Sequence, residues 1–470
     1  MARIIVNSSL NQRNAGNTAL LAVLFAGVLI SALDIAIVGP ALPAIQNDFA
    51  VSGRALSWVF SAYILTGLIS APLMAKLSDR YGRRNVYLFD IALFGLGSLV
   101  VAISASFEML LIGRVLQAFG AGGILPVASA VIGDTFPEER RGPALGLIGA
   151  VFGVAFLLGP LLGGVLLQWS WRWLFLINIP IVLVVFWQAS RLLPSTPMSV
   201  RLPFDLLGVV FLSVSLLSLA LGISWINVNA LFVSLLTPKI ISILLIAITG
   251  FCFLWAIEKR AIDPVLPPKL LSKRELKLLA IIAMGTGLAE AGMVFLPALA
   301  VAAFDVEEAT ASFMLVPLVT AMIFGAPLAG WLVARWGAKK IIQLGLLMVI
   351  GGLFIFGVPV ISSRTFYLGG ILVGVGLSGI LGAPLRYIII RETPRGQAGS
   401  GQGLLTIFLS VGRILGAATV GGFIAFQQGG VEGFQEAYFL VAVMITPVVI
   451  FSALLKPDKI IRQSRSSSSI

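Results

Sequence analysis

Histidine is absent from the 470-residue sequence, which excludes imidazole as a metal ligand or proton carrier. The single cysteine, Cys252, rules out a disulfide bond within the chain. Charged residues make up only 11% of the composition, whereas a soluble domain carries about a quarter. So few charges cannot coat a water-facing surface, so we expect the lipid bilayer to be the solvent of this chain.

Apolar residues are correspondingly abundant, at 59% of the sequence. They form fourteen runs, each long enough to cross the roughly 30 Å hydrocarbon core of a membrane. For two of these runs, 205–225 and 240–258, a re-entrant or surface-lying position is the alternative. The 50 glycines and 23 prolines are compatible with membrane helices, because neighbouring helices can satisfy an interrupted backbone. The sequence therefore predicts an all-α polytopic membrane protein.

The positions of the basic residues predict its orientation. An even number of spans places both termini on one side, and nearly all loop Lys and Arg residues then fall on that side. The exceptions are Arg54, Arg172, Lys239 and Arg364. By the positive-inside rule, both termini are expected in the cytoplasm, with the chain in the cell inner (plasma) membrane. Residues 1–17 are polar and precede a run too long for a signal peptide, so no cleaved signal is expected.

An internal repeat divides the chain. Ala71-Pro72-Leu73 recurs as Ala326-Pro327-Leu328, and Leu42-Pro43-Ala44 recurs as Leu296-Pro297-Ala298. Related halves are typical of transporters, in which the substrate site lies near the midplane between them. We predict an N-terminal six-helix bundle (1–200), an inserted helix pair with a cytoplasmic linker (201–274), a C-terminal six-helix bundle (275–456) and a disordered cytoplasmic tail (457–470).

The loop Asp79-Arg80-Tyr81-Gly82-Arg83-Arg84 combines three arginines with one acid. Arg83 and Arg84 contribute to topology, but an acid adds little to it, so Asp79 requires another role. We expect Asp79 to accept hydrogen bonds from Arg80 or from a helix N-terminus across the interface between the halves, as a conformational latch. Asp134 is a candidate partner of this cluster. In the second copy Ala334 replaces Asp79, so the latch is predicted to be asymmetric.

This loop resembles the signature of the major facilitator superfamily, with one departure at Ala75, where that signature usually has glycine. Arg114-x-x-Gln117-x-x-Gly120 is similar to the fourth-helix motif of the superfamily. Leu33-Asp34-x-x-Ile37-Val38-x-x-Ala41-Leu42-Pro43 and Trp171-Arg172-Trp173-x-Phe175-x-Ile177-Asn178-x-Pro180 resemble its fourteen-helix drug:proton antiporter branch. The resemblance implies two six-helix bundles plus two inserted transmembrane helices.

Small residues cluster in the fifth span and resemble the motif associated with antiporters in that superfamily. Closely spaced glycines let two backbones approach, and a proline kinks a helix, so the cluster predicts a hinge. Ordinary small-residue packing is a compatible alternative. The residues concerned are Gly149, Gly153, Gly159, Pro160, Gly163 and Gly164.

Charges within spans cost several kcal/mol unless they are paired or hydrated, so they indicate mechanism. Asp34 and Glu290 precede the repeat-equivalent Pro43 and Pro297 and are expected to face one central cavity. A carboxylate there could bind either a proton or a substrate cation, which amounts to antiport. As alternatives, Asp34 hydrogen-bonds the backbone near a broken turn, and Glu290 lines a solvated mouth.

Two arginines accompany these acids. Arg114 is expected to keep a nearby carboxylate ionised or to bond backbone carbonyls at a helix crossing. Arg413 is expected either to pair with an acid or to receive an anionic group. Asp90, nearer the cytoplasmic surface, is expected to pair with a loop cation.

Aromatic residues are expected to line the cavity, since they suit lipophilic and cationic ligands. The candidates are Trp58, Tyr63, Phe119, Phe152, Phe156, Phe295 and Phe313.

Together these features predict a proton-coupled secondary transporter that exports lipophilic, cationic small molecules by alternating access. One alternative is a lipid or glycolipid exporter that binds an anionic headgroup through Arg413 or Arg386. Another is a membrane sensor or scaffold that does not transport. The sequence contains no nucleophile–base pair and no metal cluster, so we expect no enzymatic activity, cofactor, metal or nucleic-acid partner. We expect the chain to act as a monomer.

Overall fold

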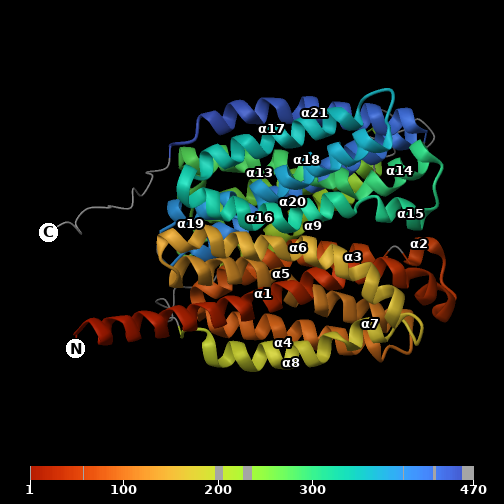
Figure 1. Ribbon diagram of the computed structural model, residues 1–470. Helices are drawn as coiled ribbons and strands as arrows, with labels where there is room; N and C mark the ends of the chain where they lie inside the picture. The colour runs from red at the N-terminus through yellow and green to blue at the C-terminus, as the bar shows by residue number, and fades with distance from the viewer. Residues whose placement is uncertain are drawn as a thin grey trace.

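The computed structural model describes residues 2–56, 58–195, 205–225, 236–394, 396–426 and 430–457. Within these residues the regular structure is helical, and the helices lie side by side (Figure 1). The start of α1 and the end of α21 lie on the same side of the bundle, which we call the terminus end; the opposite side is the far end (Figure 1). The predicted tail lies outside the described residues from 458 onward.

The N-terminal half contains α1 (Ala2–Phe49), α2 (Gly53–Leu56), α3 (Trp58–Tyr81), α4 (Arg83–Ala102), α5 (Phe107–Thr135), α6 (Glu138–Leu166), α7 (Trp173–Leu176) and α8 (Asn178–Leu192). The inserted pair consists of α9 (Leu206–Ser224) and α11 (Pro238–Glu258). The C-terminal half contains α12 (Pro268–Ser272), α13 (Arg274–Gly292), the 3-10 turn η2 (Met293–Phe295), α14 (Leu296–Phe304), α15 (Glu308–Phe313), α16 (Val316–Trp336), α17 (Ala338–Phe356), α18 (Ser363–Leu381), α19 (Pro384–Glu392), α20 (Ala398–Phe426) and α21 (Val431–Ala453).

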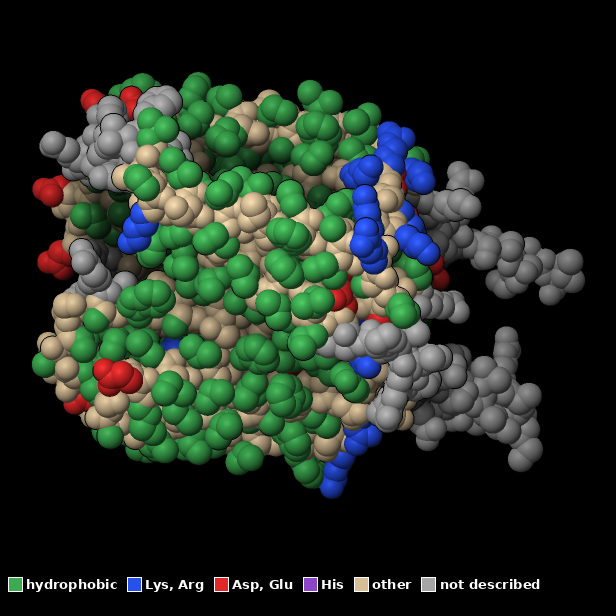
Figure 2. Space-filling view, turned by 180° about the vertical axis from the view of Figure 1, so that it is seen from behind, with side chains coloured by type: hydrophobic (Ala, Val, Ile, Leu, Met, Phe, Trp, Pro, Cys, Tyr) green, Lys and Arg blue, Asp and Glu red, His purple; other side chains and the backbone are tan. Residues whose placement is uncertain are grey.

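In the part of the chain that the structure describes, fourteen helical segments are long and apolar enough to cross a membrane, as the sequence predicts. Both inserted helices are among them, as 206–223 and 238–258. Apolar side chains cover the sides of the molecule, Lys and Arg gather at the terminus end, and acidic side chains mark the far end (Figure 2). The two-bundle, fourteen-helix fold expected from the sequence is confirmed.

The repeat is visible in the backbone. Gly82 follows α3 with φ 91°, and its counterpart Gly337 follows α16 with φ 84°. Both glycines therefore occupy a conformation that side-chain-bearing residues rarely adopt. The two loops turn in the same way because the two halves are built from the same unit.

Two spans are broken in their middle. The ninth of the fourteen passes from α13 through η2 into α14, and the twelfth passes from α18 into α19 at residues 382–383. Proline starts each second piece, at Pro297 and Pro384, where its missing N–H removes no hydrogen bond. These breaks matter because Glu290 lies just before the first and Arg386 just after the second.

The halves meet closely at the terminus end, where α6 packs on α16. A Cβ atom added to Gly142 would lie 2.6 Å from the Gly330 carbonyl oxygen, and one added to Gly146 would lie 3.0 Å from the Gly330 Cα. Such approach is possible only between glycines. We call this contact the α6–α16 seam.

The inserted pair lies over the other contact between the halves, the α3–α20 seam. An apolar cluster joins α9 and α11 to Leu68 of α3 and Ile407 of α20. The pair therefore touches both halves and covers one of the two seams.

Candidate functional site

Two adjoining cavities lie between the halves, each of about 1070 Å³ including the space that opens outward. They share five lining residues: Leu125, Phe152, Arg386, Leu409 and Arg413. The C-side cavity is lined further by α13 and α16, and the N-side cavity by α1 and α3. Charged lining residues among those described are Glu290, Arg386 and Arg413, and most of the remaining wall is apolar.

The cavities lie on the far side of the α6–α16 seam. Along α6, Gly142 contacts Gly330 near the terminus end, whereas Gly149, Phe152 and Phe156, which follow toward the far end, line the C-side cavity. Two lining residues, Phe156 and Val294, are 51% and 76% exposed. The molecule is therefore closed at the terminus end and open toward the far end.

Glu290 and Arg413 form an ion pair in the C-side cavity, with Arg413 Nε 2.8 Å from Glu290 Oε2. Glu290 is in the last turn of α13, and Arg413 is on α20. The helices cross so closely that a Cβ on Gly287 would lie 2.1 Å from the Leu409 carbonyl oxygen. Both side chains remain partly exposed, at 28% and 44%. Of the two roles expected for Arg413, the structure shows the pairing with an acid.

Asp34 and Arg114 form a second ion pair inside the N-terminal half, where both are fully buried. Arg114 Nη1 lies 2.6 Å from both Asp34 Oδ2 and Gln117 Oε1, and Gln117 Nε2 donates to Asp34 Oδ1 at 2.6 Å. Gln117 also donates to Ser98 Oγ at 2.8 Å, which accepts a bond from Asn178 as well. Every charge in this buried network therefore has a partner.

The expectation that both acids face the cavity holds for Glu290 and is wrong for Asp34. The Tyr63 ring lines the N-side cavity and stacks on the Arg114 guanidinium, 4.2 Å from ring centroid to Cζ. This ring lies between the Asp34 network and the open space. Arg114 pairs with Asp34, and it also donates from Nε to the Val59 carbonyl at 3.3 Å, one of the two roles expected for it.

The loop after α3 forms the predicted contact between the halves. Asp79 Oδ1 accepts from the Gly399 amide at 2.9 Å, and Oδ2 accepts from the amide and hydroxyl of Ser400 at 2.7 and 2.6 Å. These donors form the N-terminus of α20, so the carboxylate also meets the positive end of a helix dipole. The expected helix N-terminus supplies these hydrogen bonds.

Arg83 supports this contact, which we call the latch (Asp79, Arg83, Asp134 and the start of α20). Arg83 pairs with Asp79, and its Nε lies 3.0 Å from Asp134 Oδ2, as expected for Asp134. Ala75, the departure from the family signature, is accommodated because Gly399 and Gly403 face it.

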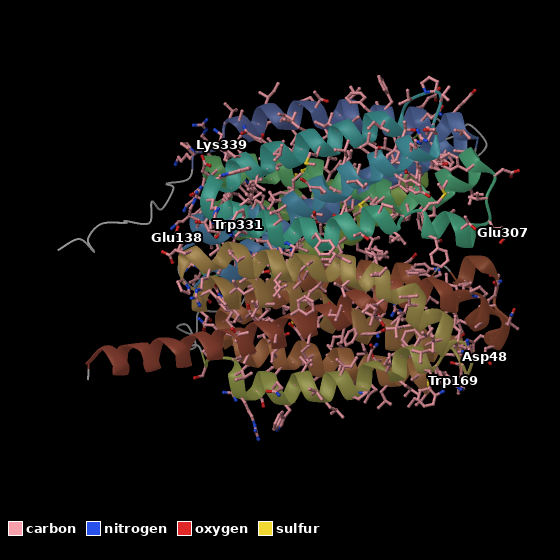
Figure 3. The ribbon with its side chains drawn as sticks, viewed as in Figure 1. Asp48, Glu138, Trp169, Glu307, Trp331 and Lys339 are labelled. Atoms are coloured by element: carbon pink, nitrogen blue, oxygen red, sulfur yellow. The ribbon has the colours of Figure 1, made fainter. Side chains whose placement is uncertain are left out.

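The remaining arginines of the loop bind elsewhere. Arg80 lies 3.7 Å from Asp263, in the linker after α11, and Lys76 pairs with the same carboxylate. Arg84 donates to the Ser190 carbonyl at the end of α8. At the same end of the molecule, Tyr387 donates to Glu138 at 3.1 Å across the halves (Figure 3).

The expected hinge residues fall into two groups. Gly149 and Gly153 contact the C-terminal half, whereas a Cβ on Gly159 would lie 2.6 Å from Ala36 within the N-terminal half. Gly163 is buried, and Gly164 faces open space. Helix α6 continues through position 160, and the side chain of Pro160 lies outside the described residues. A hinge here stays a prediction.

Of the seven expected cavity aromatics, Tyr63, Phe152 and Phe156 line a cavity. The other four are wrong: Trp58 and Phe313 are exposed outside both cavities, and Phe119 and Phe295 pack against the hydrophobic core. The rotation of each helix, which composition does not reveal, separates these groups.

Asp90 also departs from its expectation. It is fully buried on α4 and has no hydrogen-bond partner for either oxygen among the described residues. A Cβ on Gly123 would lie 2.1 Å from Asp90 Oδ2, so the carboxyl fills the space above this glycine. No loop cation reaches it in the described part of the chain.

Asp48 lies beyond the first membrane span, near the far end (Figure 3). It accepts from Trp171 Nε1 at 3.0 Å and from Arg172 Nη1 at 2.8 Å. The hydrogen bond from Trp171, followed by that from Arg172, lowers the pKa of this carboxyl below its usual value. The Trp171–Arg172 motif thus ties α7 to the end of α1.

Sequence reasoning did not identify Ser98 and Gln402, and it considered Arg386 only for a lipid substrate. Gln402 accepts from Arg386 Nη1 at 3.1 Å beside both cavities. One signal was available: Arg386 follows Pro384 by two residues within an apolar run, where a broken helix is expected.

The sequence matches the family model described as Major Facilitator Superfamily over residues 24–288 and 278–469. It is 36% identical to the uncharacterized MFS-type transporter YfiU of Bacillus subtilis, covering 86% of this chain and 80% of that protein. It is 27% identical to the multidrug transporter protein MdtP of the same organism, over 89% and 77%.

Among solved structures, the human organic anion transporter MFSD10 superposes with a TM-score of 0.71 at 17% identity, covering 93% of this chain and 99% of that one. At this identity the likeness shows the fold alone. The family match covers nearly all the helices that build the cavities and the latch. This chain therefore belongs to the major facilitator superfamily and is a multi-pass membrane transporter.

Proposed function

We propose that a single chain exports lipophilic small molecules from the cell by proton-driven alternating access. The observation that carries this proposal is the Glu290–Arg413 ion pair, which is partly exposed inside an otherwise largely apolar cavity between the halves. An intramembrane carboxylate that solvent can reach is suited to carry a proton. The printed name of MdtP, a multidrug transporter, supports small molecules as the cargo.

The coupling follows from the charges. Protonation of Glu290 removes its attraction to Arg413 and lowers the barrier to moving α13 past α20. Deprotonation restores the pair and, with it, the contact between these two helices. Transport requires that these steps alternate with opening and closing of the latch.

We place the terminus end in the cytoplasm, in the inner membrane. This orientation follows from the Lys and Arg gathered there. The conformation described would then be outward-facing. We further propose that the bundles 1–200 and 275–456 rock as units about the inserted segment 201–274.

Proton-driven accumulation of a dansylated dye in everted vesicles tests this function, because export from the cytoplasmic face carries the dye into their lumen. Glu290→Gln should reduce proton-driven efflux at least tenfold, because glutamine cannot carry the proton. Glu307→Gln, at the far end outside both cavities, is the matched control and should retain efflux. Proton-driven efflux that survives in Glu290→Gln would contradict the coupling role.

Transport of lipids or glycolipids is the second candidate. It is favoured by the two arginines that line the cavities, which suit an anionic headgroup. Arg413→Ala would then abolish lipid transfer between leaflets of proteoliposomes and spare dye efflux.

A further inference from the structure

The charges that line the two cavities do not balance. Arg386 and Arg413 contribute two positive charges, and Glu290 contributes one negative charge. Arg413 already holds Glu290 at 2.8 Å. The acid that would attract a cationic substrate is therefore occupied, and one arginine remains without a counter-charge from the lining.

Arg386 is that arginine. Only 7% of it is exposed, and it lines both cavities. Its Nη1 donates to Gln402 Oε1 at 3.1 Å and lies 3.5 Å from Ser129 Oγ. Both partners are neutral, and among the described residues no carboxylate lies within ion-pair distance of it. Burying a charge without a counter-charge costs free energy. An anion that pairs with Arg386 would supply the missing counter-charge, and its binding would therefore be favourable.

The local backbone adds to this positive field. Arg386 is in the first turn of α19, which starts at Pro384 directly after the break in the twelfth span. No side chain caps this N-terminus, and Gly382 just before it lines the C-side cavity. The N-terminal end of a half-helix inside a membrane favours anionic groups. The guanidinium and the helix end thus act in the same direction.

We propose that the cavity binds amphipathic anions, with a carboxylate or phosphate group on Arg386 and the apolar body against Phe152, Phe156 and Met293. Arginine suits this role because its planar donors match a carboxylate or phosphate in a bidentate geometry. The inference rests on the proposed export function and names its substrate class. It replaces the expectation of cationic cargo.

Three dansyl probes with one fluorescent body test the charge preference: dansylglycine (anion), dansylglycinamide (neutral) and dansylcadaverine (cation). Binding to the purified full-length protein in dodecyl maltoside is followed by fluorescence anisotropy. Dansylglycine should bind about tenfold more tightly than dansylglycinamide, the size expected of one charge-assisted hydrogen-bonded contact. Dansylcadaverine should bind no more tightly than the neutral probe.

Variants locate the preference. Arg386→Gln should bring the first two probes within about twofold of each other, and Arg386→Lys should retain part of the preference because the charge remains. Arg364→Gln, an exposed arginine outside both cavities, should leave it unchanged. Equal binding of the three probes in the unmodified protein, tighter binding of dansylcadaverine, or an unchanged preference in Arg386→Gln would overturn the proposal.

A competition arm distinguishes two sources of the anionic group. Displacement of dansylglycine by dihexanoyl phosphatidylglycerol, and not by dihexanoyl phosphatidylcholine, would assign the site to a lipid headgroup. No displacement by either would assign it to small amphipathic acids. If the unmodified protein shows the binding preference but no proton-driven efflux, the export function is overturned and the anion site stands.

Discussion

Each half places a carboxylate on its first long helix and pairs it with an arginine of a later helix, but the two pairs differ in burial. Asp34 and Arg114 are fully buried, and Gln117 bonds to both members of the pair. Glu290 and Arg413 are joined by one bond and remain 28% and 44% exposed in a cavity. A pair enclosed by partners holds helices together, whereas a pair open to a cavity can exchange a proton or a ligand. Burial, and not residue type, separates the two roles.

The largest effect is expected from breaking the buried pair. Arg114→Leu leaves Asp34 buried without a counter-charge and should lower the free energy of unfolding by about 3–5 kcal/mol. Arg413→Leu should lower it by about 1 kcal/mol or less, because its partner is exposed. Unfolding in sodium dodecyl sulfate measures both. Adding Asp34→Asn to Arg114→Leu should recover part of the loss. Equal losses in the two single variants would contradict the comparison.

Asp79 of the latch adds a third case to the comparison of the two ion pairs, because this carboxylate is buried between the halves. Asp79→Asn should weaken the contact with α20 and favour the state open at the terminus end by about tenfold, equivalent to about 1.4 kcal/mol. A cysteine at the buried Val333, in a Cys252→Ser background, reports this state through its alkylation rate. Asp134→Asn is the control and should have a smaller effect, since Asp134 touches Arg83 without touching α20. Unchanged alkylation in Asp79→Asn would show that the latch does not hold the closed state.

Asp90 is a fully buried carboxyl for which the described residues show no arginine partner. Asp90→Asn keeps its volume and removes the cost of any charge, so we expect stability to stay equal or to rise by about 1 kcal/mol. The melting temperature of the purified protein measures this change. A loss as large as that of Arg114→Leu would mean that Asp90 has a partner that this conformation does not display.

The smallest effect is expected at Asp48, whose side chain is 40% exposed. Because its pKa is lowered in the folded state, its contribution to stability is present above the usual value of about 3.9 and is lost as the pH falls below it. The difference in melting temperature between the unmodified protein and Asp48→Asn should therefore shrink between pH 6 and the acid limit of folding (about pH 3). A difference that grows on acidification would contradict the sign.

Hydropathy and charge were sufficient to predict the spans and the positive end of the molecule, because both depend on composition along the chain. The repeat predicted that Asp34 and Glu290 occupy corresponding helices. It could not predict that Asp34 turns inward, because this depends on the rotation of α1 against α5 and on Gln117 and Ser98 from other helices. The sequence predicted that Asp79 bonds across the halves. It could not identify α20 as the partner, because the start of α20 is far from Asp79 in sequence.

Arg386 illustrates a different limit. Its sequence neighbourhood resembles the end of a span, where a basic residue would be explained by topology alone. Because the helix breaks between α18 and α19, Arg386 lies on the wall of a cavity and not at the end of a span. A charged residue shortly after a proline within an apolar run therefore indicates a broken helix with the charge on a cavity wall.

The inserted pair is attached to the two halves by different kinds of force. Ion pairs from Asp263 fix its linker to Lys76 and Arg80 of α3, and ion pairs depend on position. Toward α20 it offers apolar contacts such as those of Ile407, which have no preferred direction and permit sliding. When the halves rock, the pair should travel with the N-terminal half while α20 moves along it. The inserted pair would then guide the movement of α20 relative to the N-terminal half and keep lipid out of the α3–α20 seam.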